Sequence, residues 1–109
     1  MNDTLIKVNL IKRTKNGMDT RNQIKYTENG RAVYARPIPL SRSEYFNAGI
    51  IGITPQLVLE ISAFDYKGET LLQYPAGENG RKYRIYRVYE KNVNQTELYC
   101  EYAAGANGG

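Results

Sequence analysis

The chain has 109 residues, of which 41% are hydrophobic, and its formal net charge is +4 at neutral pH. This length allows one domain with a modest core, and the ordinary apolar content argues against wholesale disorder. The chain has no histidine and one cysteine, which excludes an internal disulfide, the usual zinc sites and histidine-based catalysis. No paired-carboxylate motif or glycine-rich phosphate loop stands out, so we expect no enzyme, no cofactor and no metal site.

Signals for membranes and secretion are also missing from the sequence. There is no run of about 18 apolar residues, so no membrane span is expected. Residues 1–4 lack a basic segment followed by an apolar one, so no secretory signal is expected. One free cysteine, Cys100, fits a reducing cytoplasm, and its alternation with polar neighbours predicts a small buried side chain.

The first third of the chain predicts two hairpins. Residues 5–13 alternate as a half-buried strand does, and residues 13–22 form a polar loop that turns at Asn16-Gly17. Asn-Gly recurs at residues 29–30 between two β-prone runs, which is typical of a second hairpin turn. Pro37 and Pro39 should then end strand pairing, since proline cannot donate a backbone hydrogen bond. The first loop and its flank are basic, with Arg13, Lys15, Arg21 and Lys25.

Residues 41–48 carry the helical signal of this otherwise β-like chain. Ser41 offers an N-cap, and Glu44 stands three residues later, as in a capping box. Gly49 should end the helix, because glycine readily adopts the left-handed terminal turn. Tyr45 and Phe46 lie about 100° apart on a helix, so they cannot both face one narrow seam. The helix therefore either plugs a barrel end or presents a contact surface to a partner.

The rest of the chain predicts further strands and turns. Residues 50–55 are uncharged, follow Gly49 and contain Gly52, and we expect either a core connection or a functional loop there. We expect strands at residues 56–66, 69–74, 82–91 and 96–102, with turns at 65–68, 75–80 and 92–95, and a flexible tail at 103–109. Roughly six or seven short strands indicate a mainly β fold, a small antiparallel barrel or sandwich with one short helix and long loops. Residues 1–102 would form this single domain.

Residues 83–89 interleave tyrosines with arginines, a pattern that can stack bases and hold phosphates. If the strand alternates strictly, one face carries Tyr83, Ile85 and Tyr89, and the other face carries Arg84. The aromatic rings would then be separated from the charge. That separation favours an ordinary barrel wall. The carboxylates of Asp65 and Glu69 stand in a tight turn and are too few for a calcium site.

Residues 39–48, Pro-Leu-Ser-Arg-Ser-Glu-Tyr-Phe-Asn-Ala, resemble the Pro-Leu-Ser-x-x-Glu-Tyr-Phe-x-Ala segment of phage head–tail joining proteins, also called head closure, head completion or stopper proteins. The surrounding order is similar too. A strand ending in Arg36-Pro37 comes before the segment, and a Gly-x-x-Tyr-x-Ile element, residues 80–85, comes after it. The likeness spans residues 5–102.

The resemblance implies a small β-barrel that forms a ring, commonly of about twelve copies, between the portal or its adaptor and the tail completion or tail tube protein. Packaged double-stranded DNA would pass through the ring without sequence-specific contact, and no membrane would be involved. Such a protein resides in the virion and is assembled in the host cytoplasm. The implied interface residues are Ser41, Arg42, Glu44, Tyr45 and Phe46. The implied channel loop is Ala48, Gly49, Ile50, Ile51, Gly52, Ile53 and Thr54.

In the connector that the resemblance implies, the basic residues at 13–25 would contact a neighbouring ring. Alternatively, the chain is a nucleic-acid-binding β-barrel, with the tyrosine–arginine strand and the basic loop as its site.

Overall fold

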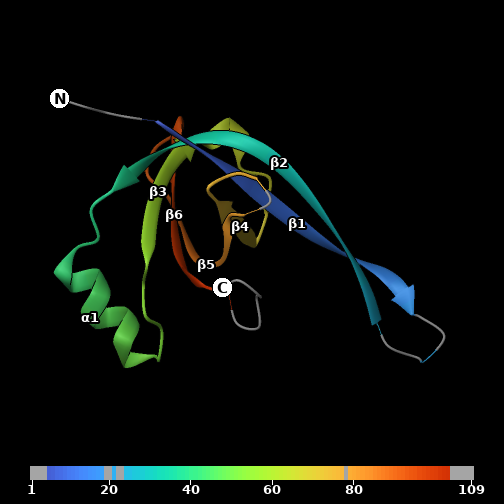
Figure 1. The fold of residues 1–109 in the computed structure, drawn as a ribbon. Coiled ribbons are helices and arrows are strands. Elements are labelled where there is room, and N and C mark those ends of the chain that lie inside the picture. Colours follow the sequence, from blue (N-terminus) through green and yellow to red (C-terminus); the bar gives the residue numbers. More distant parts are fainter. Residues whose placement is uncertain (1–4, 19–20, 22–23, 78, 104–109) are drawn as a thin grey trace.

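The structure, a computed structural model, describes residues 5–18, 21, 24–77 and 79–103. Six strands form a closed antiparallel barrel in the order β1-β2-β3-β6-β5-β4 (Figure 1). The strands are β1 Ile6–Met18, β2 Ile24–Ile38, β3 Leu57–Ser62, β4 Leu71–Tyr74, β5 Arg81–Glu90 and β6 Gln95–Tyr102. The helix α1, Arg42–Ile50, is inserted between β2 and β3, and a short 3-10 helix, η1 Ala63–Asp65, follows β3. The mainly β prediction and its barrel alternative are confirmed.

The barrel interior is filled by apolar side chains from every strand. Closure removes most free strand edges, and inward-facing positions of a small barrel are packed by side chains. Leu10, Leu59, Leu72 and Leu98 are fully buried there. Cys100 joins them as predicted, and burial raises the pKa of its thiol to about 12. These side chains form the hydrophobic core of the barrel.

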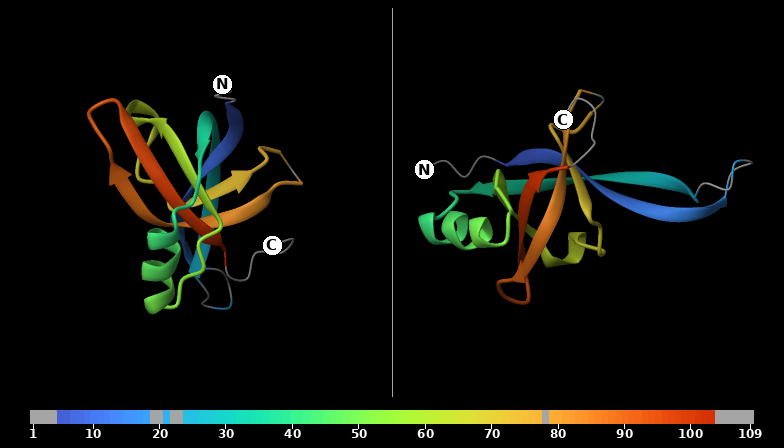
Figure 2. Two further views of the ribbon diagram at one scale, coloured as in Figure 1. Left: turned by 90° about the vertical axis from the view of Figure 1, so that its left-hand side faces the viewer. Right: turned by 90° about the horizontal axis from the view of Figure 1, so that it is seen from below.

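The β1–β2 hairpin replaces the two predicted hairpins. Lys12 pairs with Asn29 and Ile11 with Gly30, so the predicted turn at residues 28–30 is wrong. The predicted loop at 13–22 is also wrong over its described part, because β1 continues to Met18. Asn-Gly is only a local preference, and a complete cross-strand partner outweighs it. The long hairpin projects from the barrel, away from α1 (Figure 2).

The ends of β2 and β3 also differ from the predictions. β2 runs to Ile38, and Pro37 lies in register with Leu59, so the proline does not end pairing. Three residue pairs join β2 to β3, which places Pro37 in a short stretch of ladder near a strand end. β3 ends at Ser62 instead of continuing to residue 66, because the Ser62 hydroxyl accepts the Phe64 N–H and starts η1.

The structure places the remaining predicted turns correctly. Gly68 and Gly77 have positive φ values of 88° and 127° and lie in the turns before β4 and β5. Ala103 is the last described residue, so the predicted tail lies almost wholly outside the described residues. In the described part of the chain, no helix is long and apolar enough to cross a bilayer.

Candidate functional site: the α1 face and the cleft between β2 and β3

The start of α1 follows from its capping residue. The Ser41 Oγ accepts the Glu44 N–H at 3.0 Å, which satisfies one of the open donors of the first turn. The predicted N-cap is confirmed. In a full capping box, the Glu44 carboxylate would bind back to the backbone of the cap residue. Here that carboxylate points to β5 instead and binds two of its side chains. One residue therefore belongs both to the first turn of α1 and to the contact with the barrel.

The helix ends two residues later than the sequence predicts. Gly49 is helical, and Gly52 is the glycine with a positive φ, 82°. The Ile53 N–H donates to the Ala48 carbonyl at 2.9 Å and the Gly52 N–H donates to the Gly49 carbonyl at 3.0 Å. These two bonds form a Schellman motif. The prediction that the helix ends at Gly49 is wrong. Ile50 is still helical and Ile51 has a negative φ, whereas Gly52 adopts the left-handed conformation that ends the helix.

A polar anchor holds α1 to the barrel wall. The Tyr86 hydroxyl and the Arg87 guanidinium both donate to the Glu44 carboxylate at 2.7 Å. The Arg87 guanidinium also lies over the Tyr99 ring, 3.9 Å from its centroid. Burial, reinforced by the hydrogen bond to Glu44, raises the pKa of Tyr86 well above its usual range. Glu44, predicted as a partner contact, thus serves to position α1.

A bulge in β5 makes this anchor possible. Ile85 pairs with Cys100 and Arg87 pairs with Tyr99, so Tyr86 is the extra residue between them. The inserted residue changes the phase of the strand, and bulges commonly redirect side chains in this way. The strict alternation predicted for residues 83–89 therefore fails after Ile85. Past the bulge, Arg87 and Tyr89 lie opposite Tyr99 and Glu97 on the outer wall.

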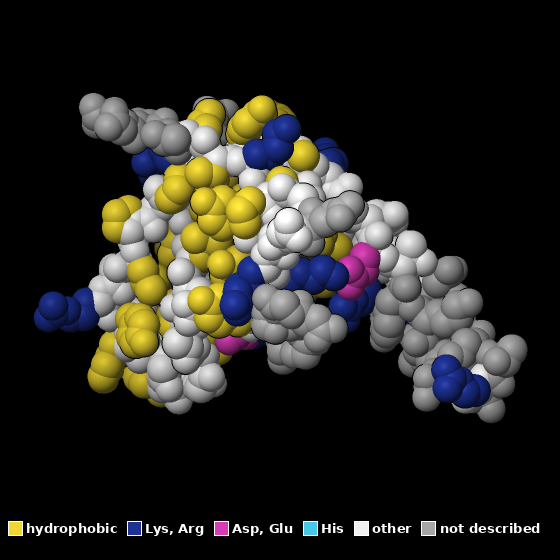
Figure 3. Space-filling model, viewed as in Figure 1, with side chains coloured by type: hydrophobic (Ala, Val, Ile, Leu, Met, Phe, Trp, Pro, Cys, Tyr) yellow, Lys and Arg dark blue, Asp and Glu magenta, His cyan; other side chains and the backbone are white. Residues whose placement is uncertain are grey.

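The opposite side of α1 is apolar and exposed. Tyr45 is 53% exposed, Phe46 69%, Ile50 70% and Ile51 72%. Ala48 is the buried residue of the helix. Both aromatic side chains face outward, so α1 does not plug the barrel. Figure 3 shows hydrophobic side chains gathered over this end of the molecule, and Tyr45, Phe46, Gly49 and Ile50 line a shallow groove of about 360 Å³.

The predicted channel loop at residues 48–54 is partly helix and partly turn. Ala48, Gly49 and Ile50 belong to α1, and Ile51 and Gly52 form its exposed end. Ile53 is half-buried and Thr54 is exposed. The alternative of a core connection is wrong for Ile50 and Ile51, because a polar anchor elsewhere holds the helix and leaves these side chains outside.

The predicted basic contact residues lie along the β1–β2 hairpin, away from α1. Arg13 forms an ion pair with Glu28 at 2.8 Å, so its charge is partly balanced. Lys15 is exposed on β1, and Arg21 is exposed at the hairpin tip. Lys25 lies on β2, and its side chain is outside the described residues. The structure thus places the two predicted contact regions at opposite ends of the molecule (Figure 2).

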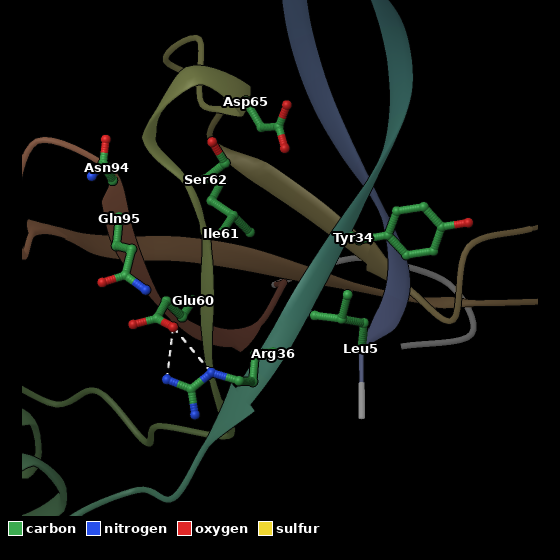
Figure 4. Close-up of a pocket in the computed structure, with 9 residues that line it drawn as sticks. All are labelled: Leu5, Tyr34, Arg36, Glu60, Ile61, Ser62, Asp65, Asn94 and Gln95. Carbon is green, nitrogen blue, oxygen red and sulfur yellow. Dashed lines mark hydrogen bonds and ion pairs between the residues drawn. The ribbon is translucent and has the colours of Figure 1, made fainter. Parts of the chain in front are cut away.

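Sequence reasoning missed a polar cleft between β2 and β3. It has a volume of about 420 Å³, and its lining residues include Tyr34, Glu60 and Asp65 (Figure 4). The Glu60 carboxylate is 5% exposed and accepts from Arg36 at 2.7 Å and from Lys91 at 3.1 Å. Burial opposes ionisation of Glu60, but these two cations hold its pKa below the usual range. A glutamate between Val58, Leu59 and Ile61 was the available sequence signal.

The described residues contain no cluster of three or more histidine, cysteine, aspartate or glutamate side chains that could hold a metal ion. Comparisons with protein-family models, curated proteins and solved structures found no match to this chain.

Proposed function

We propose that this chain is a structural virion protein of a tailed phage or prophage. It would form a ring in the head–tail connector, between the portal or its adaptor and the tail completion or tail tube protein. It would help to close the DNA channel after packaging, and it would catalyse no reaction. The observation that carries the proposal is the exposed apolar face of α1 on a barrel whose interior is already filled.

The α1 face has the properties of a protein contact surface. Burying apolar area gains about 25 cal/mol per Å², so a cluster of exposed aromatic and isoleucine side chains is favourably covered by a partner. Aromatic residues are also enriched in interface cores. A helix held mainly through one carboxylate can present this face without disturbing the barrel.

The shape of the molecule supports a role as a connector. Its principal extents are 53 × 31 × 28 Å, and the α1 end and the hairpin tip lie far apart (Figure 2). A subunit of this shape can reach neighbours at both ends. In a closed ring, weak contacts per subunit are multiplied, so no single interface has to be strong.

The end of α1 supports a channel role. Residues 48–54 carry no charge, and Ile50, Ile51 and Gly52 are exposed. Such a surface offers nothing to phosphates, so DNA would pass it without being held. The subunits would act in the virion, after assembly in the host cytoplasm.

The nucleic-acid-binding alternative has weaker support in the geometry. Arg84 pairs with Glu101 and Arg87 with Glu44, so both cations of the tyrosine–arginine strand already have carboxylate partners. The Arg87 guanidinium also covers one face of the Tyr99 ring. A base would have to displace these contacts before it could stack there.

The test is assembly with the portal protein encoded in the same genome. We expect negative-stain microscopy of the mixture to show rings seated on the portal, and Tyr45→Asp to abolish them. Tyr89→Asp is the matched control, because Tyr89 is a tyrosine of similar exposure on the barrel wall and should leave the rings intact.

A different result would overturn the proposal. If no rings form, and a single-stranded oligonucleotide binds at micromolar or tighter affinity with a steep salt dependence, the nucleic-acid alternative is correct. Tyr83→Ala and Arg84→Ala should weaken such binding.

A further inference from the structure

We infer that the α1 face of one copy docks into the cleft between β2 and β3 of the next copy, in a head-to-tail contact. The α1 face consists of Arg42, Tyr45, Phe46 and Ile50, and the receiving side of the cleft consists of Leu5, Tyr34, Asp65 and Asn94. The inference rests on the proposed function, because it assigns the subunit contact of the ring.

The cleft exists because two strands separate. β2 and β3 pair from Arg36↔Glu60 to Ile38↔Val58, and beyond this point β3 turns into η1 while β2 continues along β1. Among the described residues, no side chain fills the space between them. Leu5 and Tyr34 flank it on the β1–β2 side and are 58% and 59% exposed, so the cleft offers apolar surface beside its polar groups (Figure 4).

One carboxylate in the cleft is without a described partner. Glu28, Glu44, Glu60, Glu69 and Glu101 all form ion pairs. Asp65 differs from these five glutamates. Its backbone carbonyl accepts from Arg31, but in the described part of the chain no side chain binds its half-buried carboxylate. In Figure 4 this carboxylate projects from η1 toward the β2 side of the cleft. A carboxylate in this position favours an incoming cation.

The α1 face offers a matching cation. Arg42 is exposed in the first turn, and among the described contacts no carboxylate binds it. Tyr45 and Phe46 stand three and four residues after it, so all three side chains lie on neighbouring positions of the helix surface. The face thus presents a guanidinium flanked by two exposed aromatic rings. Arg42 would pair with Asp65, and the rings would pack on Leu5 and Tyr34.

The contact has to be between copies. None of the residues that line the cleft belongs to α1. Within one chain, Glu44 holds α1 against Tyr86 and Arg87 of β5. Two different patches on the same chain form a heterologous contact, which repeats from copy to copy and closes into a ring when the rotation allows. This is the contact that a connector ring requires.

Cysteine cross-linking of the full chain tests the inference. The one native cysteine is fully buried, so introduced thiols are the reactive ones. We expect an equal mixture of Arg42→Cys and Asp65→Cys to give a covalent dimer with a short bismaleimide. The doubly substituted chain should give a ladder of higher oligomers, and each single variant alone should stay monomeric. Lys67→Cys replaces Asp65→Cys as a matched control, because Lys67 is exposed nearby but does not line the cleft.

Charge reversal provides an independent check. Arg42→Asp or Asp65→Arg should weaken self-association by roughly tenfold, and the two changes together should restore it. Sedimentation velocity over a concentration series measures the effect. If Asp65 substitutions prevent folding, Asn94→Cys serves as the second cleft position for cross-linking with Arg42→Cys.

The outcomes separate the inference from the proposed function. Cross-linking of Arg42→Cys to itself would show that two α1 faces pack symmetrically. Absence of cross-linking in the mixture would show that the cleft does not receive the α1 face. Either result overturns the inference. If rings nevertheless form on the portal, the proposed function stands without this contact. A ladder without portal binding would keep the contact and remove the proposed function.

Discussion

The barrel interior and α1 differ in how they are held in place. The barrel buries leucine, valine and isoleucine side chains from all six strands, and several of them are wholly inaccessible. In α1, Ala48 is the buried residue, and the helix is anchored by hydrogen bonds to Glu44. The buried core that stabilises the fold and the α1 face that we propose as a contact surface therefore lie in different parts of the molecule. A change in the core should affect folding, whereas a change on the α1 face should affect only contacts with other molecules.

The two carboxylate anchors show the same contrast. Glu60 and Glu44 each bind two donors, but the Glu60 side chain is 5% exposed and that of Glu44 is 14% exposed. A less accessible carboxylate loses more when its partners are removed. The barrel anchor should therefore contribute more to stability than the helix anchor.

The largest effect is expected in the core. Leu59→Ala removes a fully buried side chain and should lower the free energy of unfolding by about 2–5 kcal/mol. Phe46→Ala, on the exposed face of α1, is the control and should change it by less than about 0.5 kcal/mol. Urea titration measures both values. Equal losses of stability in the two variants would show that α1 is part of the cooperative core, contrary to the contrast between the core and the α1 face.

Glu60→Gln should have the next largest effect. It leaves Arg36 and Lys91 without their shared carboxylate, and hydrogen bonds to charged groups contribute about 1.5–3 kcal/mol. Glu90→Gln is the control, because Glu90 is exposed and no described residue binds its side chain. Unfolding at pH 7 measures the difference.

The same pair of variants makes a pH test. The pKa values of Glu28, Glu60 and Glu69 are lowered in the folded state, so their contribution is present above the unfolded pKa and is lost as the pH falls through the folded values. Stability should decline below about pH 4.5, and less steeply in Glu60→Gln than in the native chain. An identical decline in both would show that Glu60 is not paired in solution.

Ser41→Ala should have a smaller and local effect. Loss of an N-cap costs about 1 kcal/mol. Amide hydrogen exchange in α1 should then accelerate by roughly fivefold while barrel amides stay unchanged. Ser43→Ala, inside the helix, is the control. Faster exchange throughout the barrel would contradict the separation of α1 from the core.

Tyr45→Asp should have the smallest effect on stability, within about 0.5 kcal/mol, because the side chain is largely exposed. The same change should abolish assembly with the portal. A variant that melts normally and still assembles would show that the α1 face is not the contact surface. Melting curves and microscopy of the same preparation decide the matter.

Local features were predictable where local rules dominate. The alternation in the sequence predicted a half-buried strand at residues 5–13 and a buried Cys100, and both are found, since period-2 burial is set largely by the strand itself. The cap at Ser41 was predictable for the same reason, because it bonds a neighbour three residues away. Strong local signals failed where a distant segment competed, as at residues 28–30, which pair with β1.

The β class, the place of most strands and the start of the helix could be predicted from the residues alone. Contacts between distant segments set the rest: β1 and β2 form one long hairpin, Glu44 anchors the helix, and β2 and β3 separate to leave the cleft with Asp65. The reason is the range of the interactions. Caps and alternating burial depend on residues close in sequence, whereas strand register, ion pairs and clefts depend on which distant segments meet when the barrel closes.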